Sequence, residues 1–172
     1  MIMKGKKGVI LGVANNKSIA YGIAKACAEQ GAQIAFTYLN DSLKKRVIPI
    51  AEEFGSSNFV YPCDVSNPDE IKALKESLEK DMGKIDFIVH SIAFAPKDGL
   101  TGRFYDIPKA SFDIAMDVSV YSLIEVVREL KPIMSENASV LTLTYYGGAK
   151  YIPNYNLMGV AKAALEMTTK YL

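Results

Sequence analysis

The chain has 172 residues, 49% of them hydrophobic, and its 20 Lys and Arg against 19 Asp and Glu give a formal net charge of +1. This length and apolar content fit one domain with its own core and exclude the disordered and fibrous classes. The balanced charge gives no electrostatic reason to expect a nucleic acid or an anionic membrane as partner, so a small ligand is the default expectation.

Cysteine usage points to a reducing compartment. Cys27 and Cys63 are too few and too far apart for a disulfide scaffold or a zinc site, so we predict a cytoplasmic protein without a metal. The opening residues lack the apolar core and cleavage site of a secretory signal, and no apolar run approaches the roughly 18 residues of a membrane helix. We therefore expect no membrane partner.

Short β-branched runs alternate with longer segments of helical period, a pattern typical of a parallel sheet. Strands are expected at residues 8–13, 34–38, 58–63, 85–90 and 139–145. Helices are expected at residues 18–30, from 40 or 41 to 54, at 68–82 and 108–130, and from about 155 to the chain end. On the helix at 108–130, the residues predicted to face inward are Phe112, Ala115, Val118, Ile124 and Val127.

The expected fold is α/β, a Rossmann-like doubly wound parallel sheet of five strands in the order 3-2-1-4-5. We expect residues 1–172 to form one domain. In such a sheet, ligands bind at the carboxyl ends of the strands. The segments to search are therefore 12–19, 38–41, 63–65, 90–96 and 144–155.

The turn after the first strand lacks the G-x-G-x-x-G of a typical dinucleotide site. Gly12 nevertheless permits a sharp turn, and a helix that begins near Ser18 offers N–H groups to a pyrophosphate. Gly22 would let this helix approach the strand closely. An ordinary polar turn capped by Ser18 explains the same residues equally well.

Tyr155 and Lys162 are seven residues apart on the last helix, which places them on one face and about 10 Å apart along the axis. An ammonium there can hold a ribose and favour a phenol that donates to a developing oxyanion. Tyr145, at the end of the fifth strand, is a second phenol that can reach the same point. A core tyrosine and a solvated lysine are the alternative, which these two residues alone would favour.

Four groups of residues closely resemble the bacterial NADH-dependent enoyl-acyl-carrier-protein reductases, a divergent branch of the short-chain dehydrogenases/reductases. They are Gly12 with residues 18–24, residues 35–38, residues 90–96, and Tyr145 with Tyr155 and Lys162. The resemblance covers the whole chain. Its most discriminating element is Tyr-x6-Lys in place of the usual Tyr-x3-Lys, because Met158 stands where that tyrosine would be. This disfavours a ketone or alcohol dehydrogenase.

The resemblance implies hydride transfer from NADH to the β-carbon of a trans-2-enoyl thioester on acyl carrier protein, in fatty-acid elongation. The enolate that results is then protonated at the α-carbon. By the same resemblance, Tyr155 binds the thioester carbonyl, Lys162 binds the nicotinamide ribose, and Tyr145 lies beside the enoyl group.

The resemblance also implies contacts around the cofactor. They are Gly12, Ser18 and Ile19 at the pyrophosphate, Asp64 and Val65 at the adenine, and Ser91, Ile92 and Ala93 on the adenosine ribose side. Ala95, within residues 94–96, would border the substrate. Asp64 has an alternative role as the cap of a turn before Ser66, and His90, inside an apolar strand, is interpreted as structural.

The second strand ends without an acidic residue for a ribose 2′-hydroxyl and without an arginine for a 2′-phosphate. We predict NADH as the cofactor. Lys44, Lys45 and Arg46 lie within two helical turns and keep NADPH as the less favoured alternative.

The chain ends ten residues after Lys162, whereas members of the resembled family continue through two more strands and mobile helices. We therefore expect strands 6 and 7 to be absent, the domain to be incomplete at its C-terminal end, and the fifth strand to be an apolar unpaired edge. An NAD-binding chain without turnover, a related reductase acting on a carbonyl, and an interaction protein without chemistry remain alternatives.

The last helix carries small and apolar residues on more than one side, which predicts self-association. These residues are Gly159, Val160, Ala163, Ala164 and Met167. The family resemblance implies a homotetramer.

Overall fold

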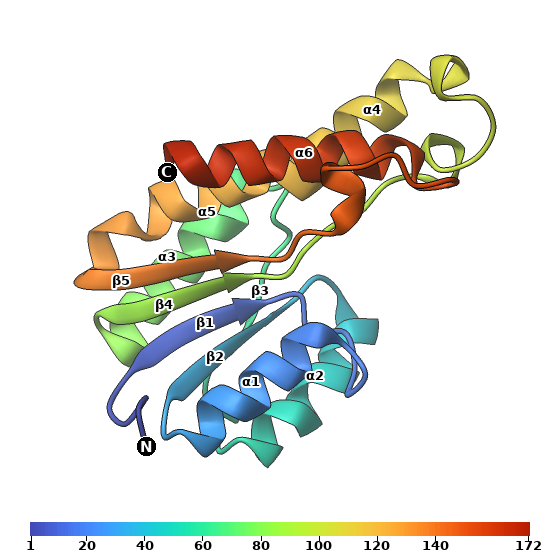
Figure 1. Ribbon diagram of the computed structural model, residues 1–172. Coiled ribbons are helices and arrows are strands. Elements are labelled where there is room, and N and C mark those ends of the chain that lie inside the picture. Colours follow the sequence, from blue (N-terminus) through green and yellow to red (C-terminus); the bar gives the residue numbers. More distant parts are fainter. The chain divides into compact units, whose positions relative to one another are not determined.

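The computed structural model describes residues 1–172 and contains one parallel sheet of five strands (Figure 1). The strands are β1 (Lys7–Leu11), β2 (Gln33–Tyr38), β3 (Val60–Pro62), β4 (Ile85–His90) and β5 (Met134–Thr142). Their order is β3-β2-β1-β4-β5, which confirms the predicted fold class and strand order.

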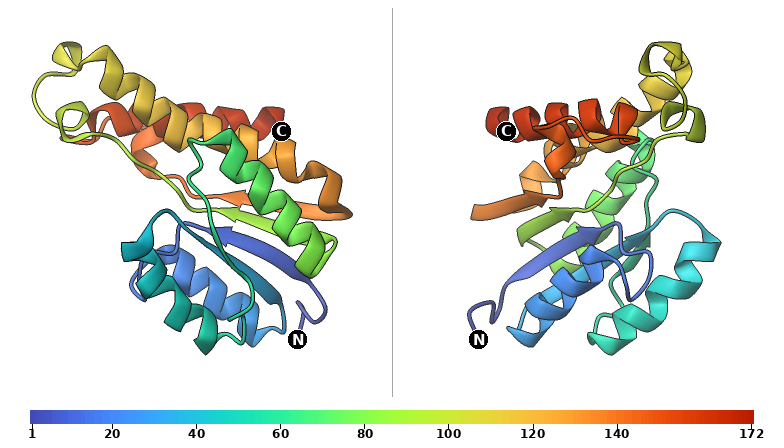
Figure 2. Two further views of the ribbon diagram at one scale, coloured as in Figure 1. Left: turned by 180° about the vertical axis from the view of Figure 1, so that it is seen from behind. Right: turned by 45° about the vertical axis from the view of Figure 1, so that its right-hand side comes forward.

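The helices are α1 (Ile19–Glu29), α2 (Asp41–Glu53), α3 (Pro68–Met82), α4 (Lys109–Met116), α5 (Ser122–Leu130) and α6 (Asn156–Tyr171). Helices α1 and α2 cover one face of the sheet, and α3 lies on the opposite face, in front of the strands when the molecule is seen from behind (Figure 2). This arrangement follows from right-handed crossovers that change direction between β3 and β4.

The chain divides into two compact units. Unit 1 comprises Met1–Ser91 and Val127–Thr142, and contains the sheet with α1, α2 and α3. Unit 2 comprises Ile92–Val126 and Leu143–Leu172, and contains α4 and α6. Each unit is described by itself below.

The centre of unit 1 is apolar on both faces of the sheet, as expected for parallel strands covered by helices. Val9, Ile10 and Leu11 of β1 are 0% exposed, as are Ile34 and Phe36 of β2. Gly8 is part of this packing, because a Cβ at that position would lie 2.4 Å from the Phe87 ring of the neighbouring strand β4.

The helix starts of unit 1 follow from asparagine caps. The Asn40 side-chain oxygen accepts the N–H of Leu43 at 3.0 Å, and that of Asn67 accepts the N–H of Asp69 at 3.1 Å. Pro68 then occupies the first turn of α3, where its missing N–H costs nothing. The buried face of α3 is formed by Ile71, Leu74, Leu78 and Met82.

The prediction of one continuous helix at 108–130 is wrong. This segment is divided into α4, a π-helical turn η3 (Asp117–Tyr121) and α5. A π-turn inserts an extra residue into the helical repeat, so a face assigned with a constant 3.6 period is displaced. Of the predicted inward residues, Ala115 is buried, Phe112 is 38% exposed, and Val118, Ile124 and Val127 are only half-buried. The fully buried positions are instead Ser119, Leu123, Val126 and Leu130.

Several predicted strand boundaries also change. β1 ends at Leu11 and not at residue 13, and β5 ends at Thr142, so Tyr145 lies three residues beyond the strand and not at its end. β3 is limited to three residues, Val60–Pro62, and β5 begins at Met134, five residues before the predicted start. β5 pairs with β4 alone and forms an edge of the sheet, where Val140 is 39% and Leu141 49% exposed.

None of the helices combines the length and the apolar character needed to cross a bilayer. The His, Cys, Asp and Glu side chains form no group of three or more that could hold a metal ion.

Candidate active site

The first strand-to-helix turn in unit 1 is built around Gly12, whose φ of 96° lies in the region that favours glycine. The Ser18 hydroxyl donates to the Asn15 carbonyl oxygen at 2.7 Å and does not cap α1. The alternative of a turn capped by Ser18 is therefore wrong. The first-turn N–H groups of α1 have no side-chain acceptor, and Ile19 beside them is 70% exposed, an arrangement suited to a bound anion.

The predicted role of Gly22 is wrong. A Cβ at this position would meet nothing within 4 Å, so the residue does not mediate a close approach between α1 and the sheet. Ala20 and Ala24, which are 0% exposed, form the buried side of α1 instead.

The carboxyl end of β3 places Asp64 in a turn. Its Oδ1 accepts both the N–H and the hydroxyl of Ser66, at 2.9 and 2.7 Å, as in the alternative role predicted for it. Val65 is 7% exposed and lies in the core of the unit. The contact of both residues with an adenine stays a prediction.

The ends of β1 and β4 lie side by side in unit 1, because the Ser91 N–H donates to the Leu11 carbonyl at 3.0 Å. Gly12 and Ser91, both predicted to contact the cofactor, are thus brought together. His90, the residue before Ser91, is 0% exposed, and its ring nitrogen Nδ1 lies 3.5 Å from the Thr142 hydroxyl, in line with a structural role.

In unit 2, the predicted cofactor residues Ile92 and Ala93 and the predicted substrate residue Ala95 lie on the segment that begins after Ser91. Ser119 of the π-turn holds the middle of this segment: its hydroxyl accepts the Phe94 N–H and donates to the Phe94 carbonyl, both at 3.0 Å. Ser119 is 0% exposed. Sequence reasoning missed it, because a serine among apolar residues carries no signal for a π-turn.

Tyr145 and Tyr155 are in contact in unit 2, with ring centroids 4.8 Å apart and an interplanar angle of 66°. Burial, and to a lesser degree the neighbouring Tyr145, raise the pKa of the Tyr155 phenol. The phenol therefore keeps its proton at neutral pH and can donate it in a hydrogen bond to an oxyanion. Tyr145 is more open, at 48% exposed.

The backbone around Tyr155 is unusual. Asn154 and Asn156 have φ values of 64° and 40°, and they are the two non-glycine residues of the chain with positive φ. Such conformations are uncommon and gather at functional sites, and asparagine tolerates them best. Gly147 contributes to the same site, since a Cβ there would lie 2.4 Å from Cδ1 of the Tyr155 ring.

Lys162 is nearly buried on α6, at 6% exposed, and its Nζ donates to the Leu143 carbonyl at 2.7 Å. Burial lowers the pKa of this ammonium. The alternative of a solvated lysine is wrong. An almost buried ammonium with one of its three hydrogens on a backbone carbonyl has two more to offer to hydroxyl groups of a ligand.

Comparison with known proteins assigns the chain to a family. Residues 12–172 match the family model described as Enoyl-(Acyl carrier protein) reductase. The chain is 54% identical over 171 residues to the enoyl-(acyl-carrier-protein) reductase (NADH) 1 of Rhizobium meliloti (strain 1021). That alignment covers 99% of this chain and 62% of the relative, so the chain spans less than two thirds of the relative's length.

Solved structures agree. The crystal structure of the enoyl-(acyl-carrier-protein) reductase (NADH) from Aquifex aeolicus VF5 superposes with a TM-score of 0.97 at 53% identity, over 99% of this chain and 67% of that one. The reductase from Anaplasma phagocytophilum in complex with NAD has a TM-score of 0.95 at 47% identity, over 99% of this chain and 65% of that one. The chain therefore belongs to the enoyl-(acyl carrier protein) reductase family.

Proposed function

We propose that this protein reduces the trans-2 double bond of enoyl thioesters carried on acyl carrier protein, with NADH as hydride donor, in fatty-acid elongation. The observation that carries the proposal is the pair of contacting phenols, Tyr145 and Tyr155, on the same unit as the buried ammonium of Lys162. Met158, 8% exposed, occupies the position of the usual catalytic tyrosine, which speaks against a carbonyl reductase of the common type.

In the proposed mechanism, the Tyr155 phenol donates a hydrogen bond to the thioester carbonyl and stabilises the oxyanion as the enolate forms. A raised pKa suits this role, because the phenol stays protonated while it donates. Lys162 would hold the nicotinamide ribose hydroxyls and so orient the ring, and Tyr145 would lie beside the enoyl group. NADH, when bound, supplies the hydride that reaches the β-carbon.

The residues of unit 1 fit a dinucleotide. The left-handed backbone at Gly12 and the first turn of α1, which no side chain caps, suit a pyrophosphate, and we assign Ser18, Ile19 and Ser91 to the same cofactor. Asp64, Val65, Ile92 and Ala93 complete the proposed cofactor contacts, and Ala95 is proposed to contact the substrate.

The choice of NADH over NADPH rests on the end of β2. Asn40, which follows this strand, uses its side-chain oxygen to cap α2, and the Lys44 ammonium lies over the Tyr38 ring, 5.6 Å from its centroid. Lys44 thus already has an aromatic partner. Titration with both cofactors tests the choice, and tighter binding of NADPH would overturn it.

One assay tests the reaction itself. NADH oxidation is followed with crotonyl thioester for the wild type and for Tyr155→Phe and Lys162→Ala. We expect Tyr155→Phe to lower kcat/KM by at least about 100-fold, the range typical of a lost oxyanion donor. We expect Lys162→Ala to lower it as well, because the nicotinamide ribose loses the ammonium that orients it. Turnover that is unaffected by Lys162→Ala would remove that residue from the mechanism. NADH binding without any turnover in the wild type would favour a binding protein.

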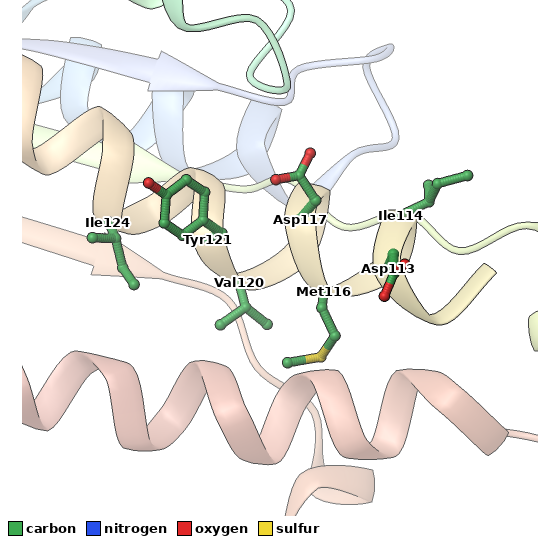
Figure 3. A pocket seen from close by; sticks show the side chains of 7 residues that line it. All are labelled: Asp113, Ile114, Met116, Asp117, Val120, Tyr121 and Ile124. Atoms are coloured by element: carbon green, nitrogen blue, oxygen red, sulfur yellow. The ribbon is translucent and has the colours of Figure 1, made fainter. Parts of the chain in front are cut away.

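We also propose a homotetramer. A pocket with a mostly apolar lining runs along α4, η3 and α5, and its lining residues are Asp113, Ile114, Met116, Asp117, Val120, Tyr121 and Ile124 (Figure 3). Ile114 is 43% and Tyr121 46% exposed, and Val160 and Met167 of α6 are 40% and 51% exposed. Sedimentation equilibrium tests the homotetramer, and a monomer at micromolar concentration would contradict it.

We also propose a cytoplasmic location, in keeping with the free thiols of Cys27 and Cys63.

A further inference from the structure

Glu166 lies on α6 and has no part in the function proposed above. It is half-buried, and its Oε1 accepts the hydroxyl of Thr144 at 2.5 Å. Hydrogen bonds from a hydroxyl to a carboxylate are short and are stronger than those between neutral groups. Thr144 immediately precedes Tyr145, so this bond fixes the backbone that carries a proposed catalytic phenol.

Glu166 and Lys162 are four residues apart on α6 and therefore share one face of the helix. Lys162 donates to the carbonyl of Leu143, and Glu166 accepts from the side chain of Thr144. One face of α6 thus holds two consecutive residues of the segment between β5 and Tyr145.

The two charged groups are directed to this segment and not to each other. Side chains of opposite charge four residues apart on a helix often pair, and Lys75 with Glu79 does so at 2.7 Å. Lys162 and Glu166 form no such ion pair, since each is engaged by a different residue of the strand exit. Because Glu166 is directed to Thr144, it does not neutralise the Lys162 ammonium.

The contact is tightened by a glycine that follows Tyr145. A Cβ at Gly148 would lie 2.9 Å from Glu166 Oε1 and 3.0 Å from the backbone nitrogen of Ala163. The turn at Gly148 therefore packs directly on α6, beside the same carboxylate. The segment is held on both sides of Tyr145, by Thr144 before it and by Gly148 after it.

We propose that Glu166 is a positioning residue: by holding Thr144, it fixes the Leu143 carbonyl at Lys162 and the Tyr145 ring against Tyr155. It acts through these neighbours. The catalytic meaning of this arrangement rests on the proposed function, whereas the ordering of residues 143–148 by Glu166 does not.

The test compares Thr144→Val and Glu166→Ala with two conservative variants, Thr144→Ser and Glu166→Gln, which can still form the hydrogen bond. The matched control is Thr169→Val, which removes a hydroxyl on α6 that bonds only the Glu166 backbone carbonyl, at 2.7 Å. We expect kcat to fall about tenfold in Thr144→Val and Glu166→Ala, with KM for NADH within about twofold. Thr144→Ser and Glu166→Gln should keep most of the activity.

Hydrogen exchange followed by mass spectrometry supplies a readout that needs no turnover. Peptides that cover residues 143–148 should exchange faster in Thr144→Val and Glu166→Ala, and at the wild-type rate in Thr169→Val. Unchanged exchange in both variants would overturn the proposal, and so would an equal acceleration throughout the chain. A wild type without enoyl reductase activity would overturn the proposed function but not the ordering of this segment.

Discussion

The Tyr155 ring is positioned by close packing against glycines. Gly147 admits the ring of Tyr155, and Gly159 admits the carbonyl of Gly147, since a Cβ at Gly159 would lie 3.0 Å from that oxygen. The phenol is thus positioned by close backbone packing and by the two asparagines with positive φ beside it.

Gly147→Ala tests this placement. The added methyl group would overlap the Tyr155 ring and crowd the Tyr145 ring, so the contact between the two rings must change. We expect kcat with crotonyl thioester to fall at least about tenfold, since small displacements of a catalytic group are costly. NADH affinity, measured by fluorescence titration, should change little. A variant with wild-type kcat would show that the ring has no fixed position in catalysis.

At this scale, the sequence predicted the groups that are proposed to carry the chemistry but not the groups that hold them in place. Tyr155 and Lys162 could be selected because their spacing and their place after the last strand are visible in the sequence. Ser119, Glu166 and Gly147 could not, because their roles depend on residues 22 to 25 positions away or on packing against a ring. Gly22 shows the opposite error, in which a sequence pattern suggested a close approach that the structure leaves empty.

Among the elements, α1 offers a direct check of the packing described for Gly22. Glycine inside a helix is destabilising relative to alanine, and the space beside Gly22 is open. We expect Gly22→Ala to raise the free energy of unfolding by about 0.5–1 kcal/mol, measured by urea denaturation. A destabilised variant would show that α1 does approach a neighbour at this residue.

The elements were predictable where one periodicity holds from end to end. α3 has a proline start, a glycine stop with φ of 73°, and a regular apolar face, and it was predicted to the residue. The helix interrupted by η3 was not, because an inserted π-turn changes the period without changing the composition. The first half of β5 was missed because Ser135, Glu136 and Asn137 lack the apolar pattern of a buried strand, while an edge strand does not require it.

At the scale of the whole sheet, Asp86 joins three strands at their amino ends. It bonds the Lys6 ammonium at 2.9 Å, the Lys7 N–H at 3.0 Å and the Ser135 hydroxyl at 3.1 Å. Burial alone would raise the pKa of this carboxyl, but these three donors outweigh it and lower the pKa. A carboxyl with a lowered pKa in the folded state stabilises the fold above the pKa of the unfolded chain, near 4, and this contribution is lost as the pH falls through the folded value.

Asp86→Asn should therefore lower the free energy of unfolding by about 1 kcal/mol at pH 7. The deficit should shrink below about pH 4, because the wild-type carboxyl then takes up its proton. Urea denaturation at pH 7 and pH 3 measures both effects. Glu79→Gln, which removes the exposed ion pair with Lys75, is the control and should change stability by less than about 0.5 kcal/mol. A deficit that is equal at both pH values would contradict the ionic origin of the effect.

The two units are interleaved along the chain, which crosses from one to the other after residues 91, 126 and 142. As the polypeptide leaves the ribosome, four strands of the sheet are therefore available before the segment of unit 2 that carries Ser119 is made. The fifth strand follows, and then Tyr155 and α6, which carries Lys162 and Glu166. Vectorial synthesis thus delivers the proposed catalytic side chains after strands β1 to β5 have been made.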